Sequence, residues 1–245
     1  MKRQQISQAA LPEVGQPLAG GFYAGRIFFD GAEHAVIDAG RAFELTAQWW
    51  DRAGPKPNIR GAKSYFDGMA NTQAMAEAGS AIAAKVLKMV IRGHRGWHIP
   101  AIEELQVLRA NLTQLKDWGR YWPSDGEGGP AQAFTQHSYW SSTQRSAGSA
   151  WNSAVHIWCT PTTNWASREM GIRPVRTLRI KADGFIHAPA SDATPVQASL
   201  QGLANVTMVR DMVERYANED GGKFYGRVDD LVAELAAIGK EARHG

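Results

Sequence analysis

The clearest structural signal in this sequence is the segment Gly96-Trp97-His98-Ile99-Pro100-Ala101-Ile102-Glu103-Glu104-Leu105. After Pro100, apolar residues recur every three or four positions, which is the spacing of one buried helix face. Proline suits the first turn of a helix, and the two glutamates lie near the positive end of the helix dipole. The pattern predicts an amphipathic helix that begins at Pro100, with Trp97 seating its start against a core.

Three β-prone runs follow this helix, at 138–142, 150–159 and 172–180. In the middle run, alternate residues put Trp151 and Val155 on one face and Asn152 on the other. Both faces carry apolar side chains, which indicates an inner strand that is covered on both sides. Most of the nine tryptophans lie between Trp97 and Trp165. This density predicts either an aromatic core or an aromatic contact surface.

Upstream, two β-prone runs at 22–29 and 34–37 flank Asp30-Gly31, a strong turn signal. They predict a β-hairpin. Residues 40–67 contain no regular pattern and are expected to form an irregular loop. Two short helices are expected at 71–78 and 80–90, separated by Gly79, with Ser80 as the cap of the second.

The C-terminal part has a different composition from the rest of the chain. Residues 182–195 are small or proline and predict a linker. Beyond them, apolar residues again step by three or four, with a break at Gly221-Gly222, which predicts a two-helix module over 196–245. Such a module has little core of its own, so it must pack on another surface. We expect an extended N-terminal arm at 1–20 and the main domain at 21–181.

Composition argues against several classes of partner. The net charge is +3 over 245 residues, and the basic residues form no run typical of nucleic-acid binding. The longest apolar stretch is too short to span a bilayer, and the first residues lack the apolar region of a signal peptide. The single cysteine, Cys159, cannot form an intrachain disulfide. We expect a globular protein that folds in the cytoplasm, without nucleic acid or membrane insertion.

Three motifs resemble a phage- and prophage-type C-type-lectin-like domain family (Lcl C-terminal-like). The resemblance implies an α+β fold: a C-type-lectin-like domain with two helices and short antiparallel sheets, an N-terminal β-hairpin and a helical C-terminal module. It covers roughly residues 12–180, and segments near 20–25, 67–72 and 79–80 add to it. The fold-motif residues are Trp97, Pro100, Glu104 and Leu105, then Tyr139, Trp140, Ser141, Ser142 and Trp151, and finally Arg173 and Arg176.

The sequence departs from the functional patterns of related lectin-like proteins. Calcium-dependent sugar binders use a Trp-Asn-Asp strand, whereas this chain has Trp151-Asn152-Ser153 and lacks the carboxylate. Formylglycine-generating relatives need paired cysteines, and only Cys159 is present. His94 and His98 are spaced four apart but lie among residues unsuited to a helix, so no metal pair is expected. We expect no enzyme, no cofactor and no bound metal.

What remains is binding. Members of the resembling family occur in tail and other virion-associated proteins, which implies a phage or prophage virion protein that is assembled in the bacterial cytoplasm. Its partners would be other virion proteins and a host cell-surface glycan or protein, with homo-oligomers formed through the C-terminal helices. The alternative is a purely structural assembly or decoration protein without a host ligand. The candidate ligand-binding loop residues are Tyr121, Trp122, Trp158, Asn164, Trp165 and Arg168.

Overall fold

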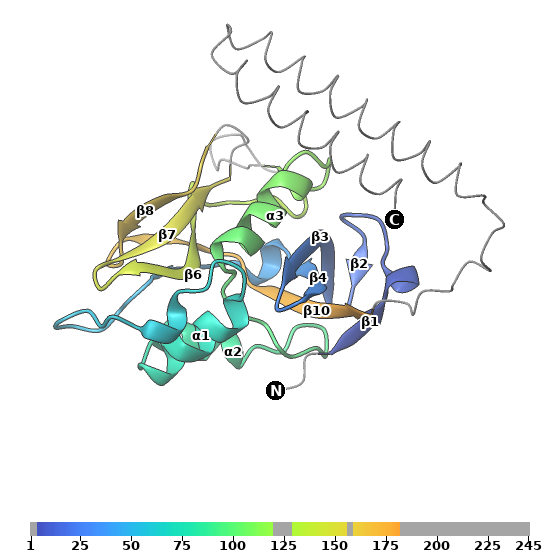
Figure 1. The fold of residues 1–245 in the computed structure, drawn as a ribbon. Coiled ribbons are helices and arrows are strands. Elements are labelled where there is room, and N and C mark those ends of the chain that lie inside the picture. The colour runs from blue at the N-terminus through green and yellow to red at the C-terminus, as the bar shows by residue number, and fades with distance from the viewer. Residues whose placement is uncertain (1–3, 120–128, 156–158, 182–245) are drawn as a thin grey trace, which may run out of the picture. The chain divides into compact units, whose positions relative to one another are not determined.

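The computed structural model describes residues 4–119, 129–155 and 159–181. This part of the chain is mostly β, with two five-stranded sheets and three short α-helices (Figure 1). The predicted linker at 182–195 and the predicted two-helix module at 196–245 lie outside the described residues.

The first sheet contains the predicted N-terminal hairpin and has the strand order β1-β10-β4-β3-β2. The hairpin is confirmed, because β3 and β4 pair antiparallel across Asp30-Gly31, whose φ angles are 50° and 65°. Positive φ at both positions is what a tight turn between twisted strands requires. The strands are β1 (Gln5–Ser7), β2 (Pro17–Leu18), β3 (Gly21–Phe29), β4 (Ala32–Asp38) and β10 (Val175–Lys181).

The second sheet has the order β5-β9-β6-β7-β8. The predicted inner strand is β7, which lies between β6 and β8, with Ala150 packed in one hydrophobic cluster and Val155 just beyond the strand in another. The strands are β5 (Leu45–Gln48), β6 (Ser138–Ser146), β7 (Ser149–Ala154), β8 (Thr162–Trp165) and β9 (Glu169–Ile172).

The expected fold class is wrong. An α+β fold with two helices and short antiparallel sheets was predicted, whereas the described chain is dominated by its two five-stranded sheets. The sheets are also not purely antiparallel, because β1 pairs parallel to β10 and β6 meets β9 in a parallel pairing. The local sequence patterns predicted only some of the strands in each sheet. The N-terminal residues and two short edge strands, β5 and β8, enlarge the sheets beyond that prediction, which is why the expected fold class is wrong.

The three α-helices are α1 (Gly68–Glu77), α2 (Ala81–Leu87) and α3 (Ile102–Leu112), and three 3-10 turns lie at Gln8–Ala10, Arg41–Phe43 and Arg60–Ala62. The prediction of helices on either side of Gly79 is confirmed, and the Ser80 side chain accepts from the N–H of Ala83 as the cap of α2. The amphipathic helix after Pro100 is also confirmed, but it begins two residues later than predicted.

Three hydrophobic clusters hold these elements together. One lies between the second sheet and α1 and α2, with Trp49, Trp50 and Trp140 at its centre. The second surrounds α3, which packs against strands of both sheets (Figure 1). The third lies on the other face of the first sheet and contains Trp97. Burying each large aromatic side chain removes up to about 250 Å² of surface from water, so these clusters dominate the packing.

Two segments expected to be loops contain strands. Residues 45–48 form β5 within the predicted irregular region, and residues 162–165, which include the predicted ligand-binding loop residues Asn164 and Trp165, form β8. The predicted strand at 172–180 is divided as well. Its first residues belong to β9 in the second sheet, and the chain then crosses at Arg173-Pro174 to β10 in the first sheet. Proline cannot donate to a β-ladder, so it suits this crossing.

Candidate functional site

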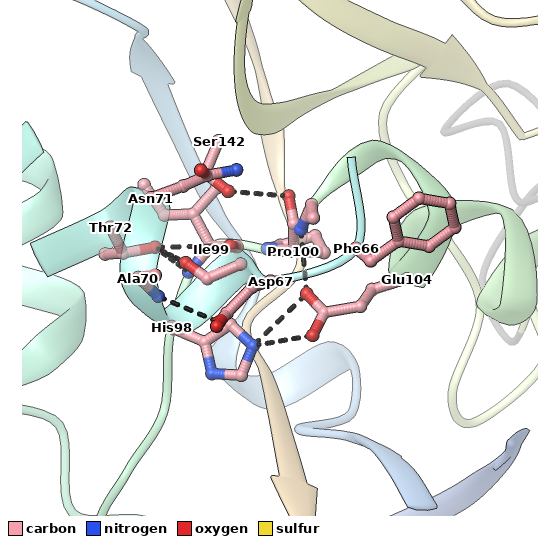
Figure 2. Close-up of polar contacts among 12 residues, drawn as sticks. Phe66, Asp67, Ala70, Asn71, Thr72, His98, Ile99, Pro100, Glu104 and Ser142 are labelled. Atoms are coloured by element: carbon pink, nitrogen blue, oxygen red, sulfur yellow. Dashed lines mark hydrogen bonds and ion pairs between the residues drawn. The ribbon is translucent and has the colours of Figure 1, made fainter. Parts of the chain in front are cut away.

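The motif around Trp97 folds into a buried polar junction where α3 begins (Figure 2). The N–H of Ala101 donates to Glu104 Oε2 at 2.8 Å, and Nε2 of His98 lies 3.2 Å from both carboxylate oxygens. The side chains of His98 and Glu104 are 0% and 1% exposed. Gly68 makes room for this pair, because a Cβ there would lie 2.2 Å from Glu104 Oε2. The carboxylate caps the helix start, where unpaired N–H groups favour negative charge.

Hydroxyl groups join this junction to α1 and β6 (Figure 2). Thr72 Oγ1 accepts from the N–H of Ile99 at 3.1 Å and donates to Gly68 O at 2.7 Å. The N–H of Ser142 donates to Pro100 O at 2.7 Å, and the Ser142 hydroxyl donates to the same oxygen at 3.2 Å. These buried hydroxyls satisfy backbone groups, which accounts for polar residues inside a hydrophobic region.

The second motif is buried in the same way. Trp140 is 0% exposed, and its indole N–H donates to Arg168 O at 3.2 Å. Ser141 links two segments, because its hydroxyl donates to Trp151 O at 2.8 Å and its carbonyl accepts from the Trp49 indole at 2.8 Å. Each partner is a backbone or indole group. The motif side chains therefore fasten β6 to its neighbours.

The third motif supplies a buried ion network at the crossing between the sheets. Arg173 donates through Nε and Nη2 to the two oxygens of Asp38, at 2.7 Å and 3.0 Å, and through Nη1 to Glu44 at 2.9 Å. The Tyr139 hydroxyl donates to the same Glu44 at 2.9 Å. Asp38 ends β4 in the first sheet and Glu44 precedes β5 in the second, so one guanidinium ties the two sheets together.

The electrostatics of this network follow from burial and from close charges. Burial acts to lower the pKa of Arg173, but the neighbouring carboxylates of Asp38 and Glu44 outweigh it and raise that pKa. Burial, reinforced by Glu44, raises the pKa of Tyr139 far above its usual range. Arg173 therefore stays charged and Tyr139 stays neutral at physiological pH.

These two clusters have few means of acting on a substrate. Arg173 and Asp38 are 0% exposed, as are His98 and Glu104 at residue level, so no solvent path reaches them directly. His94, four positions before His98, accepts from Arg176 Nη1 at 3.2 Å through Nδ1. Across 4–119, 129–155 and 159–181, no three His, Cys, Asp or Glu side chains group as metal ligands would.

The candidate ligand-binding residues within the described chain lie on and after β8. Trp165 is 70% exposed, Asn164 is half-buried and Arg168 is exposed. Asn164 Oδ1 accepts from the N–H of Trp165 at 3.0 Å and from Arg168 Nη1 at 3.4 Å, so the three residues form one local unit. Tyr121, Trp122 and Trp158, the other candidates, lie outside the described residues.

Tyr65 and its neighbour Phe66 are exposed aromatics that the sequence analysis did not single out, and Tyr65 lies beside Trp151. Tyr65 and Phe66 are 42% and 46% exposed, and the Tyr65 and Trp151 ring centroids are 5.8 Å apart. Trp151 pairs with Thr163, so Trp165 lies diagonally across the ladder on the same face of the sheet. We call Tyr65, Phe66, Trp151 and Trp165 the aromatic row. The available signal was Tyr65-Phe66 directly before the helix cap Asp67, outside any apolar periodicity.

One member of the aromatic row, Trp151, has a buried donor that lacks an acceptor. Among the described residues, Trp151 Nε1 and Gln106 Nε2 are buried without a hydrogen-bond partner. An unpaired buried donor costs about 1–3 kcal/mol, and such groups are rare in folded proteins. The unpaired indole N–H of Trp151 therefore lowers the stability of the fold within the aromatic row.

Comparison with models of known protein families and with curated protein sequences finds no match. Among the described residues, none of the helices combines the length and the hydropathy that a membrane span requires.

Proposed function

We propose that this chain is a non-enzymatic phage or prophage virion protein that binds a host surface or a neighbouring virion protein through the aromatic row. The observation that carries this proposal is the exposure of Trp165, 70% of whose surface remains open to solvent on an edge strand. The motifs that resemble phage and prophage proteins support the virion setting and assembly in the bacterial cytoplasm.

The aromatic row has the composition of a contact surface. Tryptophan and tyrosine offer large, stiff contact areas and are enriched among residues that dominate binding energy. Polar side chains that can adapt their hydrogen bonds flank Trp165, namely Asn164 and Arg168 on its own segment and Ser149 opposite it. A partner that covers Trp165 would bury apolar area while keeping polar contacts at the rim.

The buried groups support a binding role over catalysis. The acids, the histidine and the arginine that could do acid–base chemistry at the two clusters are enclosed and paired with each other. Their partners lie on different strands and helices, so their work is to hold the scaffold. The exposed side chains of Tyr65, Phe66 and Trp165, by contrast, remain open to a partner.

The test is a titration of fluorescently labelled full-length protein onto intact cells of a panel of bacterial strains, with and without EDTA. We expect saturable binding to at least one strain, unchanged by EDTA. Trp165→Ala should weaken that binding by about tenfold or more, because hot-spot tryptophans contribute over about 1.4 kcal/mol.

Phe28→Ala is the matched control, because Phe28 is another aromatic residue with 66% exposure and lies on β3 in the other sheet. It should leave binding within about twofold of the unmodified protein. Equal losses in the two variants would contradict the proposal. Absence of binding to every strain, together with burial of Trp165 in assembled particles, would favour the purely structural alternative.

A further inference from the structure

A pocket of about 310 Å³ lies between α1, the Arg95-Gly96 turn and β10, separate from the aromatic row. Gln4, at the start of the described chain, forms part of its wall, and Met69 and Leu178 add apolar surface. Its charged wall residues are Arg95, Arg176 and Asp67, which leaves an excess of positive charge. The volume is at the lower end of the range for small-molecule sites.

Arg176 forms the inner wall of this pocket and is only 3% exposed. All its hydrogen-bond acceptors among the described residues are uncharged. Nη1 donates to Ala19 O at 2.9 Å and to His94 Nδ1 at 3.2 Å, and Nη2 donates to Gln4 Oε1. Burial lowers the pKa of Arg176, and within the described residues no carboxylate forms an ion pair with its guanidinium.

Arg173, three residues earlier, donates to two carboxylates, whereas the acceptors of Arg176 named above are uncharged. Arg173 uses Nε and Nη2 as a two-pronged donor to both oxygens of Asp38. The corresponding edge of Arg176 is partly open, because its Nε has no partner among the described residues and Nη2 donates only to the neutral Gln4 Oε1. A Cβ built on Gly96 would have Arg176 Nε as its one neighbour within 4 Å, at 3.8 Å. The open edge therefore faces the Gly96 wall of the pocket.

We propose that this pocket binds a small oxyanion, a carboxylate or phosphate group, through the open edge of Arg176 and the side chain of Arg95. A guanidinium edge matches two oxygens of either group in geometry and charge. Arg95 is exposed at the pocket wall and can approach the same anion from solvent. A buried cation without a counter-charge is costly, and a bound oxyanion would supply the missing charge.

Asp67 restricts how the anion can lie. Its Oδ1 accepts from the N–H of Ala70 at 2.9 Å, so the carboxylate is held at the start of α1. An anion must therefore stay at the Arg95 and Arg176 end of the pocket. A second negative group directed towards Asp67 would be repelled, which favours compact ligands with one anionic end.

The experiment is an NMR titration of the full chain with its arginine Nε–H groups labelled with ¹⁵N. Sodium phosphate and sodium acetate are added separately, with sodium chloride exchanged to hold ionic strength constant. We expect a saturable shift of the Arg176 Nε–H signal, half complete near about 1 mM, a typical range for a ligand held by a few charge-assisted hydrogen bonds. The tighter of the two anions identifies the ligand class. Arg176→Lys assigns the signal.

Arg95→Glu tests the site without disturbing the buried arginine, and Arg145→Glu is its matched control. Arg145 is exposed on β6 and is not part of the pocket, so it makes the same charge change elsewhere. Arg95→Glu should weaken anion binding about tenfold or more, and Arg145→Glu less than about twofold. The inference is overturned if neither anion gives a saturable Arg176 shift, or if the two variants weaken binding equally.

Discussion

Arg173→Met tests whether the two sheets depend on one buried guanidinium. Arg173 donates five hydrogen bonds, three to Asp38 and Glu44 and two to the carbonyls of Gln132 and Ala133. Its side chain is 0% exposed, and those of Asp38 and Glu44 are 0% and 6% exposed. Methionine fills similar space but leaves both carboxylates without a cation and two carbonyls without a donor.

The expected loss of stability follows from this burial. Removing one partner of a buried ion pair costs about 3–5 kcal/mol, because the remaining charge stays desolvated. For a domain of this size, each kcal/mol lowers Tm by about 2–4 °C, so the melting temperature should fall by about 6–20 °C. An exposed ion pair would account for only about 0–1 kcal/mol.

The assay is urea unfolding followed by circular dichroism, with calorimetry to confirm the change in Tm. Asp38→Asn in the Arg173→Met background removes one of the orphaned charges and should recover about 1 kcal/mol or more. Arg173→Lys keeps the charge but loses the two-pronged geometry, so it should fall between the two proteins.

A loss below about 1 kcal/mol in Arg173→Met would refute the reasoning, because it would match an exposed pair. So would a double variant with Asp38→Asn that is no more stable than the single variant. Either result would mean that solvent reaches the crossing between the sheets.

The other predictions concern buried hydroxyls and the C-terminal region. Stability should fall as pH rises above about 10, where the unfolded chain's tyrosine ionises while burial and a nearby carboxylate keep Tyr139 protonated. Tyr139→Phe should remove up to about 1.4 kcal/mol of that fall per pH unit, and parallel urea-unfolding profiles from pH 9 to 11 would contradict this. Thr72→Val should cost about 1–3 kcal/mol because the N–H of Ile99 loses its acceptor, whereas Thr113→Val, at a helix end, should cost less than half as much by the same assay. We expect the full chain to form oligomers through its C-terminal residues, so a chain ended at Gly184 should be monomeric by light scattering; persistent oligomers would rule out the C-terminal residues as the assembly element.

Local features were predictable wherever the signal lay within a few residues. Asp30-Gly31 could be recognised as a hairpin turn because its positive φ angles suit these two residue types. Ser80 could be recognised as a cap because its hydroxyl satisfies an N–H three positions later. These interactions join residues that are close in the sequence, so they form whatever the arrangement of the rest of the chain.

The edge strands and the sheet architecture were not predictable in this way. Residues 162–165, which form β8, are polar apart from Trp165, so their pattern matches an exposed loop. They become a strand because β7 offers a ladder to pair with. Strand formation of this kind depends on the neighbour, and β-propensity alone is a weak guide. The error in fold class followed from these missing strands.

The candidate binding surface could likewise be predicted from the sequence only in part. Trp165 could be proposed from its polar neighbours, whereas Tyr65 and Phe66 joined it only through the packing of Tyr65 on Trp151, 86 positions away in the sequence. Residues from different elements form one surface once the chain is folded, and no spacing rule connects them beforehand.

The hairpin, the Ser80-capped helix, the helix after Pro100, the inner strand and the motifs rich in tryptophan and arginine could all be recognised from the amino-acid sequence. Only the tertiary structure decided that Arg173 meets two carboxylates, one of them 135 positions away, while Arg176 meets neutral acceptors beside a pocket. The two arginines have the same side chain and lie three positions apart in one motif. What separates them is the distant charge that folding brings near, because the cost of a buried guanidinium depends on its neighbours in space.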